Sequence, residues 1–313
     1  MLVKHSIIMI CYNQEKYIRT ALDSILNEQV KPYEIIIGDD FSTDKTREIL
    51  KEYQSKFSEI IKLVFNNKNL GIFENLNKVA PMATGDIISI LSGDDWYKPK
   101  LIENMNKKLI QLNLNPIKSR FILLPHTVLR RKNGKEKIYR NVSNVLDRYS
   151  PVGSVFRGLL HTRHVGLSRA LFDKWPLFES DSGDLGLWTD FVHHVLLTQH
   201  IERLVIMDCE GPVYCTGVGI TSKTSKESLH RSYHAALVRI QRYHNQGQLL
   251  LNNVDAKYLE FLIQCRSPNL KFNAASGACV FRATWRLVRE KGAGIGSIGK
   301  ELLLVIKRVF LKH

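Results

Sequence analysis

The chain has 313 residues and 44% of them are hydrophobic, which is enough for two domains or for one large domain with an extension. The five cysteines form no CxxC pair and show no metal-type spacing, so they suit a reducing cytosol better than a disulfide framework. The N-terminal apolar run is too short for a signal peptide, and no apolar run of about 18 residues predicts a transmembrane helix.

The net charge of +15 is distributed unevenly along the chain. Residues 217–313 contain 16 Lys and Arg against 5 Asp and Glu, a net of +11, whereas residues 1–216 contain 29 against 25, a net of +4. A basic C-terminal part indicates a polyanionic partner, which would be nucleic acid, anionic lipid or a phosphorylated substrate. The alternative is a solvated basic face that has no partner.

In the first hundred residues, predicted strands alternate with predicted helices. Apolar runs predict buried strands at 6–13, 33–40, 61–67 and 86–95. Helical spacing and cap-type residues predict helices at 15–29, 42–57 and 71–85. Because polarity does not alternate within the strands, we expect an α/β fold with a mostly parallel sheet and helices on both faces.

The second part of the chain gives weaker patterns. A strand and a turn are expected over 120–140, a strand leading into a short helix over 159–175, and a helix with an acidic start over 183–200. A last pair of strands is expected over 201–217, and the chain is mainly helical from 228 onward. The Gly-, Ser- and Thr-rich segment after residue 217 therefore predicts a boundary between a domain over 1–217 and a basic helical extension over 218–313.

Two predicted strands end in adjacent aspartates, Asp39-Asp40 and Asp94-Asp95, and a third ends at Tyr12. In parallel sheets ligands bind beyond the carboxyl ends of the strands, so these side chains should converge on one cleft. Paired carboxylates there suit a hard cation or acid–base chemistry, and the plain alternative is a solvated turn. Two such pairs in one sheet favour Mg²⁺ or Mn²⁺ held together with a diphosphate. A glycine-rich phosphate loop is absent, which argues against a P-loop or dinucleotide fold.

Four segments together resemble family 2 glycosyltransferases of the Rossmann-like GT-A fold: "SIIMICYNQEKYIRTALDSIL", "YEIIIGDDFSTDKTREIL", "NLGIFENLNK" and "ATGDIISILSGDDWYKPKLIE". The likeness is close over residues 5 to about 105 and looser to about 217. It implies transfer of a sugar from a nucleotide diphosphate donor, usually with inversion and with a divalent cation, Mn²⁺ or Mg²⁺.

The resemblance also implies residues that bind the donor. Tyr12 matches the position that packs on the base, and Asp40, preceded by Asp39, matches the carboxylate that bonds the base. Asn69 and Gly71 form the Asn-x-Gly turn, and Asn75 lies on the next helix near the donor. The alternatives are a core aromatic for Tyr12, a helix cap near Ser42 for Asp40, and a surface helix residue for Asn75.

The implied metal site is the DxD-type motif, with Asp95 as the metal ligand and Asp94 as a ligand for ribose or metal. Ser92 stands where the family more often has an acidic residue, which leaves less negative charge. The family often carries a Tyr-Arg-x-His near the end of the GT-A domain. "YCTG" (214–217) has neither the Arg nor the His, so a third, histidine ligand is not implied here.

The catalytic base implied by the resemblance is Asp184, in "SGDLGLW" (182–188), with Asp181 and Asp190 as rivals. Asp184 would remove the proton from the attacking hydroxyl. It would also suit a helix N-terminus, and the two roles are compatible. "LLHTRHVGLSR" (159–169) resembles a segment that lines the donor sugar, with His161 as a weaker candidate than the others; His164 would point to the opposite face of a regular strand.

The expected function is that of a metal-dependent inverting hexosyl- or N-acetylhexosaminyltransferase of bacterial surface-polysaccharide synthesis. Its donor would be a UDP-sugar and its acceptor a polyprenyl-diphosphate-linked or growing glycan. The alternatives are a nucleotidyltransferase and a basic nucleic-acid-binding protein. No helix-turn-helix, RRM, KH or zinc pattern supports the last, so no nucleic-acid partner is expected.

The C-terminal segment 296–313 predicts an amphipathic helix. Its basic arc contains Lys300, Lys307, Arg308 and Lys312, opposite a mostly apolar face. Such a helix can lie in an anionic membrane interface, which would place the protein in the cytoplasm at the inner face of the plasma membrane. The alternative is that this face packs on the rest of the protein or on a second copy of the chain, as in a homo-oligomer.

Overall fold

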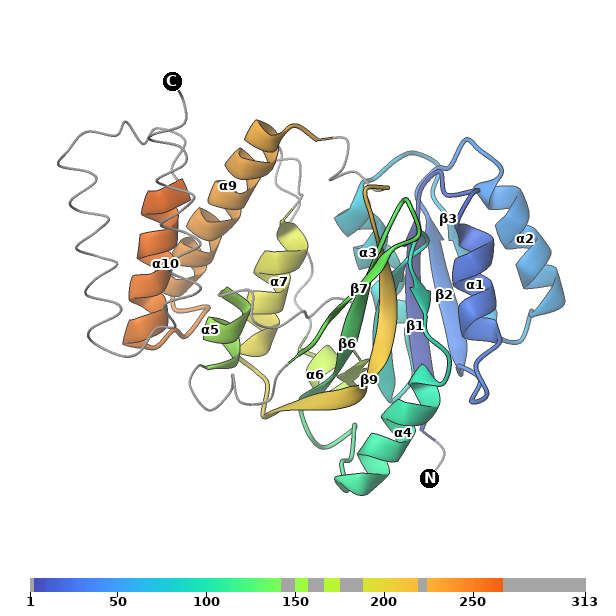
Figure 1. The fold of residues 1–313 in the computed structure, drawn as a ribbon, viewed down its shortest axis with the longest axis horizontal. Coiled ribbons are helices and arrows are strands. Elements are labelled where there is room, and N and C mark those ends of the chain that lie inside the picture. The colour runs from blue at the N-terminus through green and yellow to red at the C-terminus, as the bar shows by residue number, and fades with distance from the viewer. Residues whose placement is uncertain (1–2, 142–149, 157–165, 175–187, 219–223, 267–313) are drawn as a thin grey trace.

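The computed structural model describes residues 3–141, 150–156, 166–174, 188–218 and 224–266, with the side chains of 156, 189, 190 and 264–266 left aside. In this part of the chain nine strands form one sheet, and helices cover both of its faces (Figure 1). The strands are β1 (His5–Cys11), β2 (Glu34–Asp39), β3 (Ile61–Phe65), β4 (Ile87–Ser92), β5 (Trp96–Tyr97), β6 (Phe121–Arg131), β7 (Glu136–Tyr139), β8 (Gly166–Ser168) and β9 (Arg203–Thr216).

The helices follow the same alternation along the chain. They are α1 (Ile18–Leu26), α2 (Thr46–Lys56), α3 (Ile72–Val79), α4 (Leu101–Gln111), α5 (Pro151–Phe156), α6 (Arg169–Phe172), α7 (Thr189–Thr198), α9 (Lys226–Asn245) and α10 (Asn253–Arg266). A 3-10 turn, Ala80–Met82, follows α3 directly. The strands and helices expected in the first hundred residues are all present, because the helices carry a clear apolar period and the strands are unbroken apolar runs.

The sheet order is β3-β2-β1-β4-β8-β6-β9-β5, and β7 pairs with β6. Strands β3, β2, β1 and β4 are mutually parallel, and β6 is parallel to β9. Antiparallel pairs join β8 to β4 and β6, β5 to β9, and β7 to β6. The expected α/β class with a mostly parallel sheet is confirmed, and the parallel half contains the acidic strand ends.

The expectation of two strands over 201–217 is wrong, because one long strand, β9, runs from Arg203 to Thr216. It follows β6 along its length, with register irregularities between Leu124 and Val128. At this point Gly211 passes Pro125 so closely that a Cβ on Gly211 would lie 2.4 Å from the Pro125 Cγ. A proline cannot donate to the ladder, so the pairing is irregular at this point, and β9 resumes its pairing with β6 beyond it.

The sheet is buried on both faces by different helices. Ile7 and Met9 of β1 pack with α1, α2 and α4, whereas Ile8 packs with α3 and α6. Successive side chains of a strand point to opposite faces, so a strand with apolar neighbours on both sides carries an unbroken apolar run. This explains why the first strands show no alternation of polarity.

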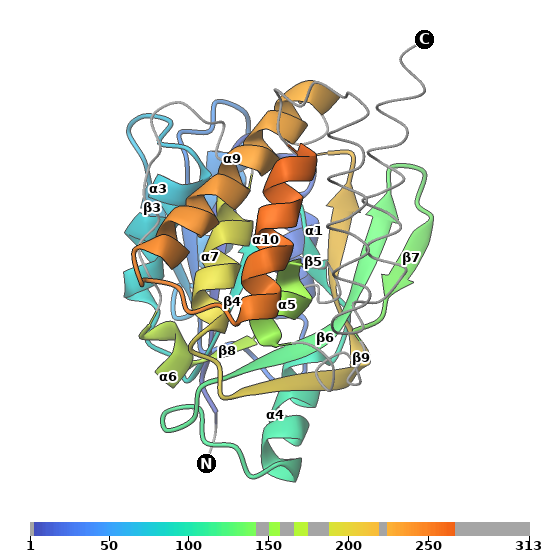
Figure 2. The same cartoon turned by 90° about the vertical axis from the view of Figure 1, so that its left-hand side faces the viewer.

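A second layer of helices, α5, α7, α9 and α10, lies beyond the face covered by α3 (Figures 1 and 2). These helices share one apolar cluster, in which the Trp188 ring lies 4.7 Å from the Tyr233 ring. Helices from both sides of residue 217 therefore contribute to one core, and the boundary expected at 217 stays a prediction. The helical character expected after residue 228 is confirmed as far as Arg266.

Candidate active site

The parallel strands bring the predicted site residues to one edge of the sheet. Cys11 pairs with Asp39 in the β1–β2 ladder, and Ile10 pairs with Ser92 in the β1–β4 ladder. The residues that follow these strands, which include Tyr12, Asp40 and Asp94, therefore lie at the same end of three neighbouring strands. The expectation that these strand ends lie together at one edge of the sheet is confirmed.

The loops after β1 and β2 are bonded to each other. The Asn13 N–H donates to the Ser42 Oγ at 2.9 Å, and the Thr43 N–H donates to the Asn13 Oδ1 at 2.8 Å. Asn13 has a φ of 52°, a left-handed conformation that asparagine adopts more readily than most residues. Tyr12 precedes this turn and is 44% exposed, so it is not a core aromatic. Its ring is accessible to a planar ligand at the strand edge.

Asp40 is buried at 4% exposure, and its carboxylate binds the Asn-x-Gly turn. Its Oδ1 accepts from the Leu70 N–H at 2.7 Å, and its Oδ2 accepts from the Gly71 N–H at 2.8 Å. Gly71 has a φ of 86°, in the region that favours glycine. Asp40 is thus not a cap for α2. Its carboxylate fixes the position of the Asn-x-Gly turn.

Asn69 and Asn75 have different environments. The Asn69 Oδ1 accepts from the Gly71 N–H at 3.1 Å at the surface. Asn75 is buried, and its Nδ2 donates to the Gly38 carbonyl at 2.8 Å, so it is not a surface helix residue. A Cβ on Gly38 would lie 2.5 Å from the Asn75 Oδ1, which is why β2 needs a glycine immediately before Asp39.

Asn66 and Arg47 belong to this site although no sequence pattern singled them out. The buried Asn66 Nδ2 lies 3.1 Å from the Asp40 Oδ1 and 3.0 Å from the Asn75 Oδ1, and the Asn66 Oδ1 accepts from Lys78. Arg47 forms an ion pair with the buried Asp39 and donates to the Asn66 carbonyl. The available signal was a polar "NN" directly after β3, which marks a third strand end at the same edge.

Asp94 and Asp95 lie on the turn after β4. Asp95 is 1% exposed, and its Oδ1 accepts from the Cys215 N–H of β9 at 2.9 Å. Asp94 is half-buried. A Cβ on Gly93 would lie 2.1 Å from the Gln14 Oε1 and 3.0 Å from the Cys11 Cβ, so the turn can approach β1 only with glycine there. The carboxylate pair is therefore held between the first and the last long strand of the sheet.

Two buried thiols respond to the negative potential of the two acidic strand ends. Burial raises the pKa of Cys11, and the Asp39 carboxylate raises it further. Burial also raises the pKa of Cys215 to about 12, with further contributions from Asp95 and Asp94. A field of this sign disfavours an approaching diphosphate unless a cation accompanies it.

The donor set fits a hard divalent cation. Asp94 and Asp95 supply carboxylate oxygens, the ligands that Mg²⁺ and Mn²⁺ prefer. Within the described residues no group of three or more His, Cys, Asp or Glu side chains gathers as a metal cage. A Mg²⁺-type site needs only one or two protein carboxylates, because phosphate oxygens complete the coordination of the ion.

Several predicted residues lie outside the described ranges, namely Asp184, Asp181, His161, His164 and the side chain of Asp190. The end of the Asp184 motif is described at Trp188, whose Nε1–H donates to the Leu229 carbonyl of α9 at 3.2 Å. The motif therefore leads into α7 where α7 contacts α9. The segment 296–313 also lies outside the described ranges.

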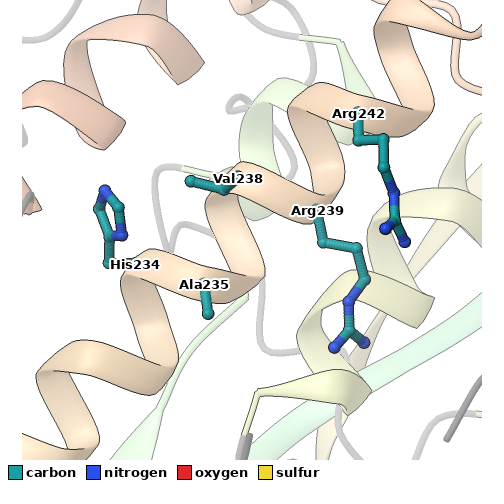
Figure 3. Close-up of a pocket in the computed structure, with 5 residues that line it drawn as sticks. All are labelled: His234, Ala235, Val238, Arg239 and Arg242. Carbon is teal, nitrogen blue, oxygen red and sulfur yellow. The ribbon is translucent and has the colours of Figure 1, made fainter. Parts of the chain in front are cut away.

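A hollow on α9 was not expected from the sequence. Its described lining is His234, Ala235, Val238, Arg239 and Arg242, all from one side of that helix (Figure 3). Burial lowers the pKa of His234. No residue that the sequence analysis singled out lines it, so it does not belong to the strand-end site.

The model of the family described as "Glycosyl transferase family 2" matches residues 6–150. The "Glycosyltransferase GlyA" of Streptococcus pneumoniae is 27% identical over 288 residues, which are 88% of this chain and 39% of that protein. The matches cover only part of the curated relatives, from 28% to 39% of their lengths.

Solved structures confirm the GT-A-like fold. Residues 1–349 of S. aureus TarS in complex with UDP align with a TM-score of 0.62 at 15% identity, over 99% of this chain and 92% of that one. The mannosyltransferase PcManGT of Pyrobaculum calidifontis, in complex with GDP-Man and Mn²⁺, aligns with a TM-score of 0.54 at 15% identity, over 100% of this chain and 89% of that one. At these identities the likeness establishes the fold alone.

Proposed function

Residues 6–150 belong to glycosyl transferase family 2, and on this premise we propose that the chain transfers a sugar from a nucleotide diphosphate donor to a hydroxyl group of a glycan. The observation that supports this best is the strand edge itself. It combines an exposed aromatic ring at Tyr12, a turn fixed by Asp40, and a carboxylate pair at Asp94 and Asp95. These are the parts needed to hold a base, a ribose and a metal-bound diphosphate in that order along one edge.

The donor proposed is a UDP-sugar. Tyr12 would stack on the uracil, since an exposed ring beside a fixed loop offers a flat apolar surface. Asp40 would accept from the base imide N–H, because its Oδ2 takes only one hydrogen bond among the described contacts and has a second lone pair. The TarS complex contains UDP and the PcManGT complex contains GDP-Man, so proteins of this fold bind either base.

The proposed metal ligands are Asp95 and Asp94, with Mn²⁺ or Mg²⁺ as the ion. When bound there, the ion would neutralise the charge that develops on the departing diphosphate. The protein contributes the placement of its carboxylates. The Cys215 N–H of β9 fixes the Asp95 Oδ1, and the Gly93 turn brings Asp94 close to β1.

The proposed reaction inverts the anomeric centre in one displacement. The acceptor hydroxyl oxygen bonds to the anomeric carbon while the bond from that carbon to the diphosphate oxygen breaks, and the diphosphate keeps the electron pair. Asp184 takes the hydroxyl proton as the general base. His161 would line the donor sugar.

The acceptor proposed is a polyprenyl-diphosphate-linked or growing glycan of a bacterial surface polysaccharide. None of the helices in the described ranges is long and apolar enough to cross a bilayer. We propose that the protein reaches a lipid-linked acceptor through surface contacts, at the inner face of the plasma membrane. The basic segment 296–313 would supply one such contact.

The test is incubation with UDP- and GDP-sugars, Mn²⁺ and a lipid-diphosphate oligosaccharide, with mass and anomeric configuration determined for the product. We expect UDP release, a gain of one sugar and an inverted configuration. Asp95→Asn should abolish transfer, and the matched control Asp173→Asn, at an exposed position next to α6, should keep it. Release of inorganic diphosphate from a nucleoside triphosphate would instead indicate nucleotidyl transfer.

A further inference from the structure

The hairpin formed by β6 and β7 ends in the most basic surface segment of the described chain outside the helices. Residues 130–140, "RRKNGKEKIYR", contain six Lys and Arg against one Glu, a net of +5 in 11 residues. The first two thirds of the chain are otherwise nearly balanced, so this segment accounts for the whole +4 of residues 1–216. We call residues 130–140 the basic hairpin.

The backbone of the basic hairpin is ordered while its side chains are exposed. The Gly134 N–H donates to the Arg131 carbonyl at 2.8 Å, and the Arg131 N–H donates to the Lys135 carbonyl at 2.9 Å, which closes the turn. Gly134 has the φ of 80° that this turn requires. Every residue from 131 to 140 is exposed. Charge is therefore presented on a rigid support.

Little of this charge is compensated within the protein. Glu136 accepts from Lys98 at 2.8 Å and from Arg130 at 3.1 Å, and no ion pair of the described residues involves Arg131, Lys132, Lys135 or Lys137. Like charges at this density repel one another, and binding an anionic surface would relieve that cost.

Protection of an edge strand is the plain alternative reading, because β7 pairs only with β6 and lysines on an edge discourage aggregation. That reading does not account for Ile138 and Tyr139, which are exposed on the same short strand. Apolar and aromatic side chains beside a basic cluster are instead typical of a surface that lies against lipid headgroups.

The basic hairpin is directly connected to the strand-end site. Arg130 pairs with Cys215 in the β6–β9 ladder, and the Cys215 N–H donates to Asp95. The Arg130 guanidinium also lies over the Trp96 ring, one residue after Asp95. From Arg130 the strand rises by about 3.3 Å per residue, so the turn projects roughly 10 Å beyond the site. Figures 1 and 2 show the turn at the same end of the sheet as the loops after β1 and β2.

We propose that the basic hairpin docks the protein on the surface of an anionic lipid bilayer. The docking needs only the residues above, while its use in presenting a lipid-linked acceptor to the strand-end site rests on the proposed function. In this orientation the carboxyl ends of the strands face the membrane. The hairpin is a contact separate from the segment 296–313.

The experiment is vesicle flotation of the full chain, without donor or metal, using phosphatidylcholine vesicles with and without phosphatidylglycerol. The test variant is Arg131→Ser/Lys132→Ser/Lys135→Ser, whose side chains make none of the turn hydrogen bonds. The control is Lys56→Ser/Lys107→Ser/Lys118→Ser, which removes the same charge from exposed positions on α2, on α4 and after α4. Thermal unfolding of all three proteins checks that each is folded.

Each basic side chain near an anionic leaflet contributes about five-fold to partitioning, so the hairpin variant should bind anionic vesicles on the order of 100-fold more weakly than the parent. The control should stay near the parent, and high salt should remove the difference. Because all three proteins keep the segment 296–313, its contribution cancels.

Three results would overturn the proposal: an equal loss in both variants, unchanged binding of the hairpin variant, or no binding of the parent even at low salt. Selective loss of binding to a labelled single-stranded oligonucleotide, with vesicle binding kept, would assign the basic hairpin to nucleic acid instead. None of these outcomes depends on sugar transfer, so failure of the docking and failure of the proposed function are distinguishable.

Discussion

The two acidic strand ends look alike in the sequence and differ in the structure. Both follow a strand as "GDD", at 38–40 and at 93–95. Asp39 and Asp40 are bonded to protein groups, Asp39 to Arg47 and to the Ser42 N–H, and Asp40 to the Asn-x-Gly turn. Asp95 accepts from a backbone N–H of β9, and Asp94 is half-buried.

The difference indicates what each pair does. A carboxylate that accepts several backbone N–H groups fixes the shape of a loop, and removing it leaves those donors without partners. In the other pair the Cys215 N–H holds one Asp95 carboxylate oxygen, and carboxylate oxygens are the ligands that a hard cation prefers. We therefore interpret Asp39-Asp40 as the pair that shapes the base and ribose end, and Asp94-Asp95 as the pair that meets the metal and the diphosphate.

Asp184, the proposed general base, should act in the reaction, as we propose for Asp94-Asp95, and should not shape a loop as Asp39-Asp40 do. Asp184→Asn keeps the shape of the side chain and loses the proton acceptor. We expect turnover to fall by about 10²–10⁴ while UDP affinity and thermal stability stay close to those of the parent. Steady-state kinetics and calorimetry with UDP measure the two quantities. If stability and donor affinity fall while turnover at saturation persists, Asp184 is a helix cap and not the base.

Asp40→Ala tests the structural pair. The substitution removes the charged acceptor of the Leu70 and Gly71 N–H groups and of the Asn66 amide, and hydrogen bonds to a charged group contribute roughly 1.5–3 kcal/mol each. We expect the free energy of unfolding to fall by about 3 kcal/mol, together with a loss of UDP affinity. Urea unfolding and UDP calorimetry would show both effects. Unchanged UDP affinity in a destabilised protein would remove Asp40 from the base site.

Gly71→Ala tests the backbone conformation of the Asn-x-Gly turn without introducing a steric clash. A Cβ at Gly71 would meet nothing within 4 Å, so the substitution adds no clash and acts only through the φ of 86°. We expect a loss of about 1–2 kcal/mol in the free energy of unfolding. The Gly71 ψ of 165° completes a conformation that essentially only glycine adopts, so Gly71→Asn should lose about as much as Gly71→Ala. Unchanged stability in either variant would contradict this explanation.

A buried carboxylate at the other end of β2 gives the smallest effect and a clear dependence on pH. Burial alone would raise the pKa of Glu34, but hydrogen bonds from Lys62, Ser6 and Thr84 lower it below its ordinary value of 4.5. The ionised group therefore stabilises the fold above about pH 4.5, and this contribution is lost as the pH falls through the lowered pKa. Glu34→Gln should cost about 1–2 kcal/mol at pH 7 and flatten the loss of stability below pH 4.5. Urea unfolding across pH 3–7 measures this difference. If the assignment were wrong, the parent and Glu34→Gln would lose stability in parallel below pH 4.5.

The sequence was sufficient for the positions of the strand ends and insufficient for their partners. Apolar runs located β1, β2 and β4, and the geometry of parallel strands then placed Tyr12, Asp40 and Asp94 at one edge. The partners that distinguish the two pairs are distant in sequence. Asn66 bonds Asp40 from 26 residues away, and the Cys215 N–H bonds Asp95 from 120 residues away.

Features after residue 105 show the same limit. The register between β6 and β9 depends on Pro125 meeting Gly211, and a local pattern of apolar residues cannot reveal that encounter. The charge of residues 130–140 was readable as a count, but its exposure and its connection to Asp95 through Cys215 follow only from the pairing of β6 with β9. Periodicity reports which residues are buried, whereas function depends here on which loops meet.

We propose that Asp94 and Asp95 hold a divalent cation, while Asp39 and Asp40 do not. The direct measurement is a Mn²⁺ titration in the presence of UDP, followed by electron paramagnetic resonance of the free ion, for the parent, Asp95→Asn and Arg47→Gln. Arg47→Gln removes the cation from Asp39 and leaves Asp95 unchanged. We predict one bound Mn²⁺ in the parent and in Arg47→Gln, and loss of tight binding in Asp95→Asn. Undiminished Mn²⁺ binding by a folded Asp95→Asn protein would contradict the account.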